Sequence, residues 1–177
     1  MSKRDLKKYL SELDKEQLEE QIIELYEKFV PVKTFYDFVF NPKEDKLLQE
    51  SKTKISHEYF PVKKPNAKWQ PKAKMRRSVA QKIIKHFILL GVDPFVIADL
   101  MLFNIEVAQT FSAGNYIKQE LFYKSILNSF EQAVNFIISN GILAEFKSRI
   151  LEIQQQTLQQ KWKNKYDFEA ILEKIDL

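Results

Sequence analysis

The stretch GVDPFVIADLMLFNIEVAQTFSAG, residues 91–114, predicts the centre of the fold. Asp93 followed by Pro94 is a helix-start pattern, because the carboxylate can cap free N–H groups and proline lacks only an N–H that has no helical partner there. The following residues are apolar on almost every side, and a helix of that kind belongs in the middle of a helical bundle. Polar and charged residues interrupt it, so we interpret it as a core helix and a poor membrane span.

The glycines extend this interpretation to the whole chain. The 177 residues include only three, and Gly91, Gly114 and Gly141 each follow a segment with helical periodicity. A glycine is favoured there because it adopts the left-handed conformation that ends many helices without a Cβ clash. No run of alternating β-branched residues indicates a strand. We therefore predict an all-α fold, one domain over residues 1–177 with about seven or eight helices and no internal repeat.

Local signals predict where several helices begin. We expect a first helix from Ser2, and Asp14 with Gln17 three residues later forms a capping-box pattern for the second. Pro31 opens a short aromatic helix, and Asn41-Pro42 predicts a cap followed by a helix that reaches about His57. A long apolar helix is expected over residues 116–140. The last amphipathic segment carries Phe168, Ile171, Leu172 and Ile175.

Composition excludes several classes of protein. The chain has no cysteine, so disulfides, thiolate catalysis and cysteine-based zinc sites are excluded. The N-terminus MSKRDLKKYLSELDKEQ carries charges where a signal peptide needs an apolar run. We expect a cytoplasmic protein that does not bind membranes.

The sequence also argues against an enzyme. His57 and His86 are the only histidines, and neither has a glutamate three residues before it, as a di-iron helical bundle requires. The glycines lie too far apart for a phosphate-binding loop, and there is no G-x-S-x-G nucleophile motif. We expect no catalytic residue, no metal and no cofactor.

Two carboxylates on the predicted core helix need an explanation. Asp99 and Glu106 are seven residues apart and therefore share one helix face. The first interpretation is structural: they face solvent or pair with cations, and Arg76, Arg77, Lys85 and His86 of the preceding helix are the expected partners. The alternative, a general acid/base pair, lacks a nucleophile or phosphate-binding group nearby.

Residues 59–92 have an unusual charge distribution. These 34 residues contain nine Lys or Arg and no Asp or Glu, whereas the other 143 carry 19 basic against 24 acidic residues, a net charge of −5. Three prolines between residues 60 and 75 favour an extended, irregular loop. We expect the strongest positive surface potential from Lys63 to Arg77, continuing to Lys82 and Lys85.

Two interpretations of this loop remain open. It combines lysines with exposed aromatic candidates such as Trp69, and single-stranded nucleic acid is bound by cations along the phosphates and rings stacked on the bases. Alternatively, the loop is a solvated connector and Trp69 anchors it to the bundle. The candidate nucleic-acid contacts are Lys63, Lys64, Lys68, Trp69, Lys72, Lys74, Arg76, Arg77, Lys82 and Lys85, with Arg76 and Arg77 expected to contact phosphate.

Five segments carry a resemblance that covers about residues 3–172. FVFNPKEDKLL, HEYFPVK, RRSVAQKIIKHF, GVDPFVIADLMLFNIEVAQTF and FYKSILNSFEQA resemble a family of uncharacterised bacterial all-helical proteins, a domain of unknown function. The resemblance implies a helical fold and assigns no functional residue.

The sequence thus supports a non-enzymatic binding module for RNA or single-stranded DNA, or for another anionic partner. The alternative is a helical protein–protein interaction or scaffold domain with no nucleic-acid role, in which partners meet exposed aromatics such as Phe35, Tyr36 and Phe38. The salt dependence of binding distinguishes these two functions, because binding to phosphates weakens steeply as the salt concentration rises.

Overall fold

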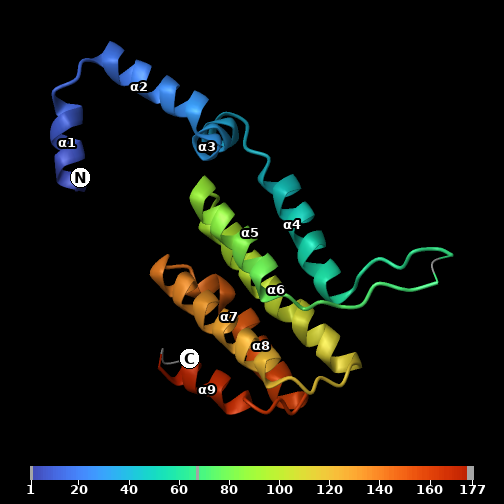
Figure 1. Ribbon diagram of the computed structural model, residues 1–177. Helices are drawn as coiled ribbons and strands as arrows, with labels where there is room; N and C mark the ends of the chain where they lie inside the picture. Colours follow the sequence, from blue (N-terminus) through green and yellow to red (C-terminus); the bar gives the residue numbers. More distant parts are fainter. Residues whose placement is uncertain (1, 67, 175–177) are drawn as a thin grey trace. The chain divides into compact units, whose positions relative to one another are not determined.

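The structure is a computed structural model that describes residues 2–66 and 68–174 (Figure 1). These residues form nine α-helices and no strand, which confirms the all-α prediction with one or two more helices than expected. The helices are α1 (Lys3–Ser11), α2 (Lys15–Lys28), α3 (Val30–Phe40), α4 (Glu44–Tyr59), α5 (Arg77–Leu90), α6 (Pro94–Gly114), α7 (Glu120–Ser139), α8 (Leu143–Gln159) and α9 (Lys165–Glu173). Ile175, predicted in the last apolar stripe, lies outside the described residues.

The chain divides into two compact units, residues 1–43 and residues 44–177. We call their described parts unit 1 (2–43) and unit 2 (44–66 and 68–174). The prediction that residues 1–177 form one domain therefore stays a prediction, and each unit is described by itself.

Unit 1 is held together by helix caps and a few side-chain contacts more than by a buried core. Ser2 caps α1, and Asp14 caps α2 in a reciprocal capping box with Gln17, as predicted. Between α2 and α3, the Tyr26 hydroxyl donates to Asp37 at 3.0 Å. Within α3, the rings of Tyr36 and Phe40 stack with their centroids 6.1 Å apart. No residue of α1, α2 or α3 is buried.

Unit 2 is built around α6, as the sequence predicted. This helix packs against α4, α5, α7 and α8, while α9 covers α7 and α8 (Figure 1). Of the described helices, only α6 is long and apolar enough to cross a membrane, and 56% of its most apolar window is buried inside the protein. Its packing is that of a core helix. The largest fully buried side chains of unit 2 include Phe87, Phe130, Phe168, Leu100 and Leu102.

Two of the three glycines end helices as predicted. Gly91 and Gly141 take the left-handed conformation at φ 69° and 70°. Gly114 does not: it remains the last residue of α6, and the chain leaves through Asn115 in an extended conformation. That prediction was wrong because a helix can also end without a left-handed residue.

Two predicted helix starts were also wrong. Asn41 ends α3 instead of capping α4, and α4 begins at Glu44, where two carboxylates in the first turn favour the helix N-terminus. Residues 116–119 precede α7 as a loop, and Ile117 within it is buried at 6% exposure. Ile117 therefore buries its side chain from a loop and not from the helical turn that the apolar pattern predicted.

Candidate nucleic-acid interface

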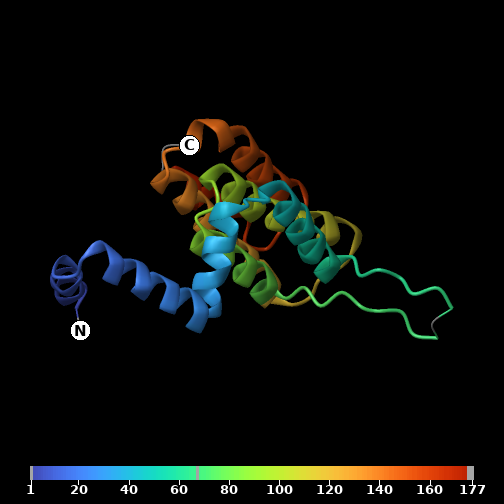
Figure 2. The same cartoon turned by 90° about the horizontal axis from the view of Figure 1, so that it is seen from above.

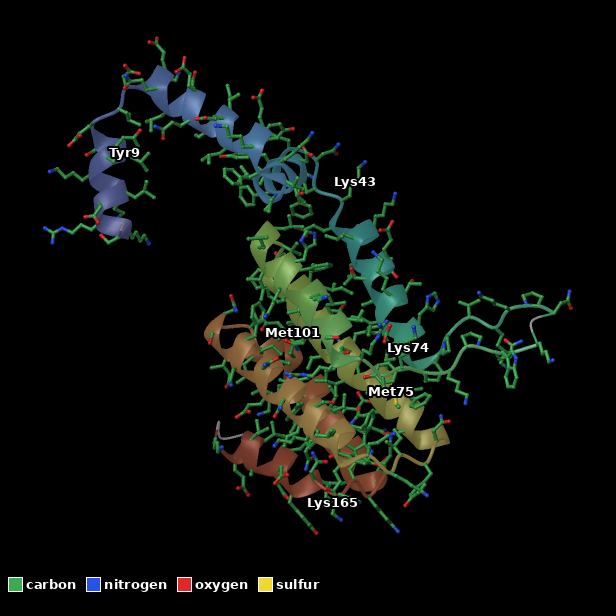
Figure 3. All side chains as sticks on the ribbon, viewed as in Figure 1. Tyr9, Lys43, Lys74, Met75, Met101 and Lys165 are labelled. Atoms are coloured by element: carbon green, nitrogen blue, oxygen red, sulfur yellow. The ribbon has the colours of Figure 1, made fainter. Side chains whose placement is uncertain are left out.

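The loop between α4 and α5 extends away from the bundle of unit 2 (Figure 2). We call residues 60–76 the basic loop; Ala67 within it is not described. At its base the Phe60 ring lies edge-on to Phe111 of α6, with the ring centroids 5.6 Å apart. The backbone N–H groups of Lys74 and Met75 donate to the carbonyl of Glu58 at 2.9 and 3.0 Å, so the returning chain is tied to the end of α4 (Figure 3).

An ion pair closes the base of the loop. Arg76 Nε donates to Glu58 Oε2 at 2.8 Å, and Nη2 donates to Oε1 at 2.7 Å. This two-point geometry is the one in which a guanidinium binds a carboxylate most specifically. The hydrogen bonds from Arg76 lower the pKa of Glu58 below its usual range. Glu58 is the carboxylate that ends the acid-free region of the sequence on its N-terminal side.

Arg77 is also occupied within the chain. Its Nε donates to Ser129 Oγ at 3.1 Å and its Nη2 to Gln132 Oε1 at 3.0 Å, so the guanidinium faces α7. The role of Arg76 and Arg77 as phosphate contacts stays a prediction, but both guanidiniums already have partners within the chain. Both side chains hold the base of the loop and the start of α5 against the bundle.

The outer part of the basic loop presents a different set of side chains. Trp69 is 82% exposed and does not lie back on the bundle as an anchor. The Lys64 N–H donates to Gln70 Oε1 and the Gln70 amide donates to the Lys64 carbonyl, both at 3.0 Å, which joins the outgoing and returning chains next to Trp69. All the lysines of the loop are exposed, and none forms an ion pair with a described residue: Lys63, Lys64, Lys68, Lys72 and Lys74.

Lys82 and Lys85 lie outside this arrangement. They are exposed on α5, five and eight residues after its first residue, which places them about 8 and 12 Å further along the helix axis. In Figure 1, α5 runs back along the bundle while the loop projects from it. The structure therefore brings the loop lysines and Trp69 together and sets Lys82 and Lys85 apart from them.

Asp99 and Glu106 are ion-paired, with partners other than those expected. Arg149 of α8 spans both: its Nη1 lies 2.6 Å from Asp99 Oδ1 and its Nη2 lies 2.8 Å from Glu106 Oε2. Lys52 of α4 lies 2.6 Å from the other oxygen of Asp99. Burial by itself raises the pKa of Asp99, but hydrogen bonds from Lys52 and Arg149 outweigh it and hold that pKa below its usual range. The pair therefore joins three helices, and Arg76, Arg77, Lys85 and His86 take no part.

A second group of cations and aromatics was missed by the sequence reasoning. A surface pocket of about 730 Å³ is lined by Tyr116, Lys118, Lys161 and Lys163, among other residues. The run KWKNKY, residues 161–166, repeats the mixture of lysine and aromatic residues seen around Trp69 and is the signal that could have indicated this pocket. Among the residues that the structure describes, no group of three or more His, Cys, Asp or Glu could hold a metal ion.

One family model matches the chain: the family of unknown function DUF6155 matches residues 1–176. The chain therefore belongs to this family, in agreement with the resemblance read from the sequence; a bacterial source stays a prediction. No curated protein and no solved structure matches the chain significantly.

Proposed function

We propose that this member of the DUF6155 family is a non-enzymatic binding protein that takes up RNA or single-stranded DNA on the outer part of its basic loop. One observation carries the proposal: Trp69 is 82% exposed, and four exposed lysines of the outer loop form no ion pair with any described residue, namely Lys63, Lys64, Lys68 and Lys72.

Physical chemistry favours this occupant over a purely solvated loop. An indole ring left in water forgoes the gain of burying its large apolar surface, and stacking a base on it recovers part of that gain. Stacking contributes about 1–3 kcal/mol per base, and lysines beside the ring can follow the phosphates. At the base of the loop, Arg76 binds Glu58, and Arg77 binds Ser129 and Gln132; these contacts hold the loop in place. The lysines further out stay available to a partner.

The test measures fluorescence anisotropy of labelled single-stranded oligonucleotides of about 20 nucleotides, longer than one typical binding site. We expect weak binding that falls with salt. The variant Lys63→Gln/Lys64→Gln/Lys68→Gln/Lys72→Gln should abolish binding at moderate salt and reduce the slope of log K against log salt by about 3, because each lost contact to a single strand removes about 0.7.

The matched control removes the same four charges elsewhere, at exposed lysines outside the loop: Lys3, Lys54, Lys147 and Lys174. This variant should bind nearly as the wild type does. Equal losses in both variants would mean that only net charge matters. Absence of any binding at low salt would leave the basic loop as a solvated connector.

A second candidate function, protein–protein interaction, is favoured by unit 1. Three helices without a buried residue leave large apolar side chains in water, including Phe40 at 81% and Val30 at 74% exposure. Exposed apolar surface of this kind often marks an interaction site. A partner captured from a nuclease-treated lysate at high salt, and lost with Val30→Ser/Phe40→Gln, would support this function. Capture that nuclease treatment abolishes would favour nucleic acid instead.

A further inference from the structure

A pocket at one end of unit 2 combines positive charge with an exposed ring. It has a volume of about 730 Å³ and lies between residues 112–118 and the turn at 160–163, and no carboxylate is among its lining residues. We call it the Tyr116 pocket. Tyr116 is 89% exposed, and Lys118, Lys161 and Lys163 surround the same space. Ligand pockets in proteins commonly span about 300–1,000 Å³, so the space is large enough for one nucleotide.

Hydrogen bonds and ring contacts hold the side of the Tyr116 pocket that Ser112, Gln160 and Trp162 line. Gln160 Oε1 accepts hydrogen bonds from Ser112 Oγ at 2.6 Å and from Trp162 Nε1 at 3.0 Å. Trp162 is 3% exposed and packs edge-on against Tyr123 and Phe168, with ring centroids 5.3 and 5.9 Å apart. Lys161 and Lys163 flank this buried ring, so their backbone positions are set by the core.

Lys161 occupies a backbone position that two other helix ends give to glycine. Its φ is 54°, and the Trp162 N–H donates to the Thr157 carbonyl at 3.0 Å, the same closing hydrogen bond that follows Gly91 and Gly141. A side chain there carries a steric penalty, because its Cβ crowds the neighbouring carbonyl. Such conformations persist only where the surrounding structure holds them, and they cluster at functional sites. The penalty and the position of this lysine at the pocket together point to a role for its side chain.

Charge at the Tyr116 pocket is mostly unpaired. Of its three lysines, only Lys163 has an ion-pair partner among the described residues, Glu120 at 3.3 Å. Both of those side chains are more than half exposed, and such surface pairs hold little energy. An anion entering the pocket can therefore replace Glu120 at small cost.

A smaller pocket lies between the basic loop and the start of α7. It has a volume of about 300 Å³ and is lined by Lys74, Met75 and Arg77, and by Gln119, Leu121 and Phe122. No described residue lines both pockets, but Lys118 and Gln119, which are adjacent in the chain, line one pocket each. The returning chain of the loop and the Tyr116 pocket therefore both lie beside the start of α7.

We infer that the Tyr116 pocket holds one nucleotide of the strand that the basic loop binds, with the base on Tyr116 and the phosphates between Lys118, Lys161 and Lys163. This inference rests on the proposed function and extends it from one contact region to two. A strand that reaches both regions binds more tightly than one that covers the loop alone, since the second contact is then intramolecular.

The test compares single-stranded oligonucleotides of about 5 and about 20 nucleotides, which bracket the usual site sizes. The variant Lys118→Gln/Lys161→Gln/Lys163→Gln should weaken binding of the longer strand about tenfold and reduce its salt slope by about 2. Binding of the shorter strand should not change. Lys3→Gln/Lys54→Gln/Lys147→Gln is the control with the same loss of charge.

Lys161→Gly separates binding from folding. It removes the side chain and relieves the backbone, so we expect a higher melting temperature together with weaker binding of the longer strand. Unchanged binding of the longer strand in both pocket variants would overturn the inference, and loss of binding in the loop variant would then leave the proposed function intact. Binding that survives the four loop substitutions but falls in the pocket variants would support a site in the pocket and contradict binding by the loop. A wild-type protein that binds neither strand would contradict both the proposed function and this inference.

Discussion

Nη1 of Arg149 in α8 lies 2.6 Å from Oδ1 of Asp99 in α6, although the two residues are fifty positions apart in the chain. The same guanidinium reaches Glu106 two turns further along α6. Side-chain exposures of 26% and 27% for Asp99 and Arg149 place the pair at the edge of the core, where water screens charge only in part. The two helices are thereby locked in one axial register, because a shift along either axis would separate Arg149 from one carboxylate.

Arg149→Met should lower the free energy of unfolding by about 1–3 kcal/mol. Removing one partner of a fully buried pair costs about 3–5 kcal/mol, and partial exposure reduces that figure. Urea denaturation checks the value, with Lys15→Met in the exposed Lys15–Glu19 pair as the control, which should cost less than about 0.5 kcal/mol. Equal effects for the two variants would contradict a structural role of Arg149.

The Asp99 pair should also appear in the pH dependence of stability. Because the folded protein holds the pKa of Asp99 below its usual range, this carboxylate stabilises the fold at neutral pH, and the contribution is lost as pH falls below about 4. Asp99→Asn should therefore be less stable than the wild type at pH 7. The difference between their unfolding free energies should shrink on acidification. A difference that stays constant down to pH 3 would mean that the carboxylate charge does not contribute.

Lys161→Gly should raise the free energy of unfolding by about 1 kcal/mol, since glycine escapes the Cβ clash of the left-handed conformation. The converse variant, Gly141→Ala, should lower it by a similar amount: nothing lies within 4 Å of the added Cβ, so backbone conformation alone sets the cost. Thermal unfolding measures both. If Lys161→Gly destabilised the protein, the lysine side chain would have to make a stabilising contact at this turn.

Arg76→Gln should weaken oligonucleotide binding much less than Lys68→Gln does, although both remove one charge from the basic loop. The reason is that Arg76 is already paired with Glu58, whereas Lys68 is exposed without a carboxylate partner among the described residues. Anisotropy titrations at two salt concentrations measure both. Equal effects would show that the Glu58–Arg76 pair opens when the strand binds.

Short-range patterns in the sequence predicted the helical architecture of this protein. The capping boxes at Ser2 and Asp14, the Asp93-Pro94 start and the left-handed Gly91 all involve residues within a few positions of one another, so their physics is complete in the local sequence. Predictions failed at helix ends, where tertiary context can override a local preference. Residues 116–119 form a loop that buries Ile117 instead of a first helical turn, and Asn41 ends α3 instead of capping α4.

The candidate interface shows the same division. Composition alone identified an acid-free, lysine-rich loop with a tryptophan, because net charge and proline content need no partner to be known. Which cations remain available was decided by tertiary structure: Glu58 takes Arg76, and α7 takes Arg77. Pairing energy falls steeply with distance, so a charge is bound or free according to what the fold brings within a few ångströms of it. Lys118 and Lys161 line one pocket because the fold places the loop before α7 next to the turn after α8.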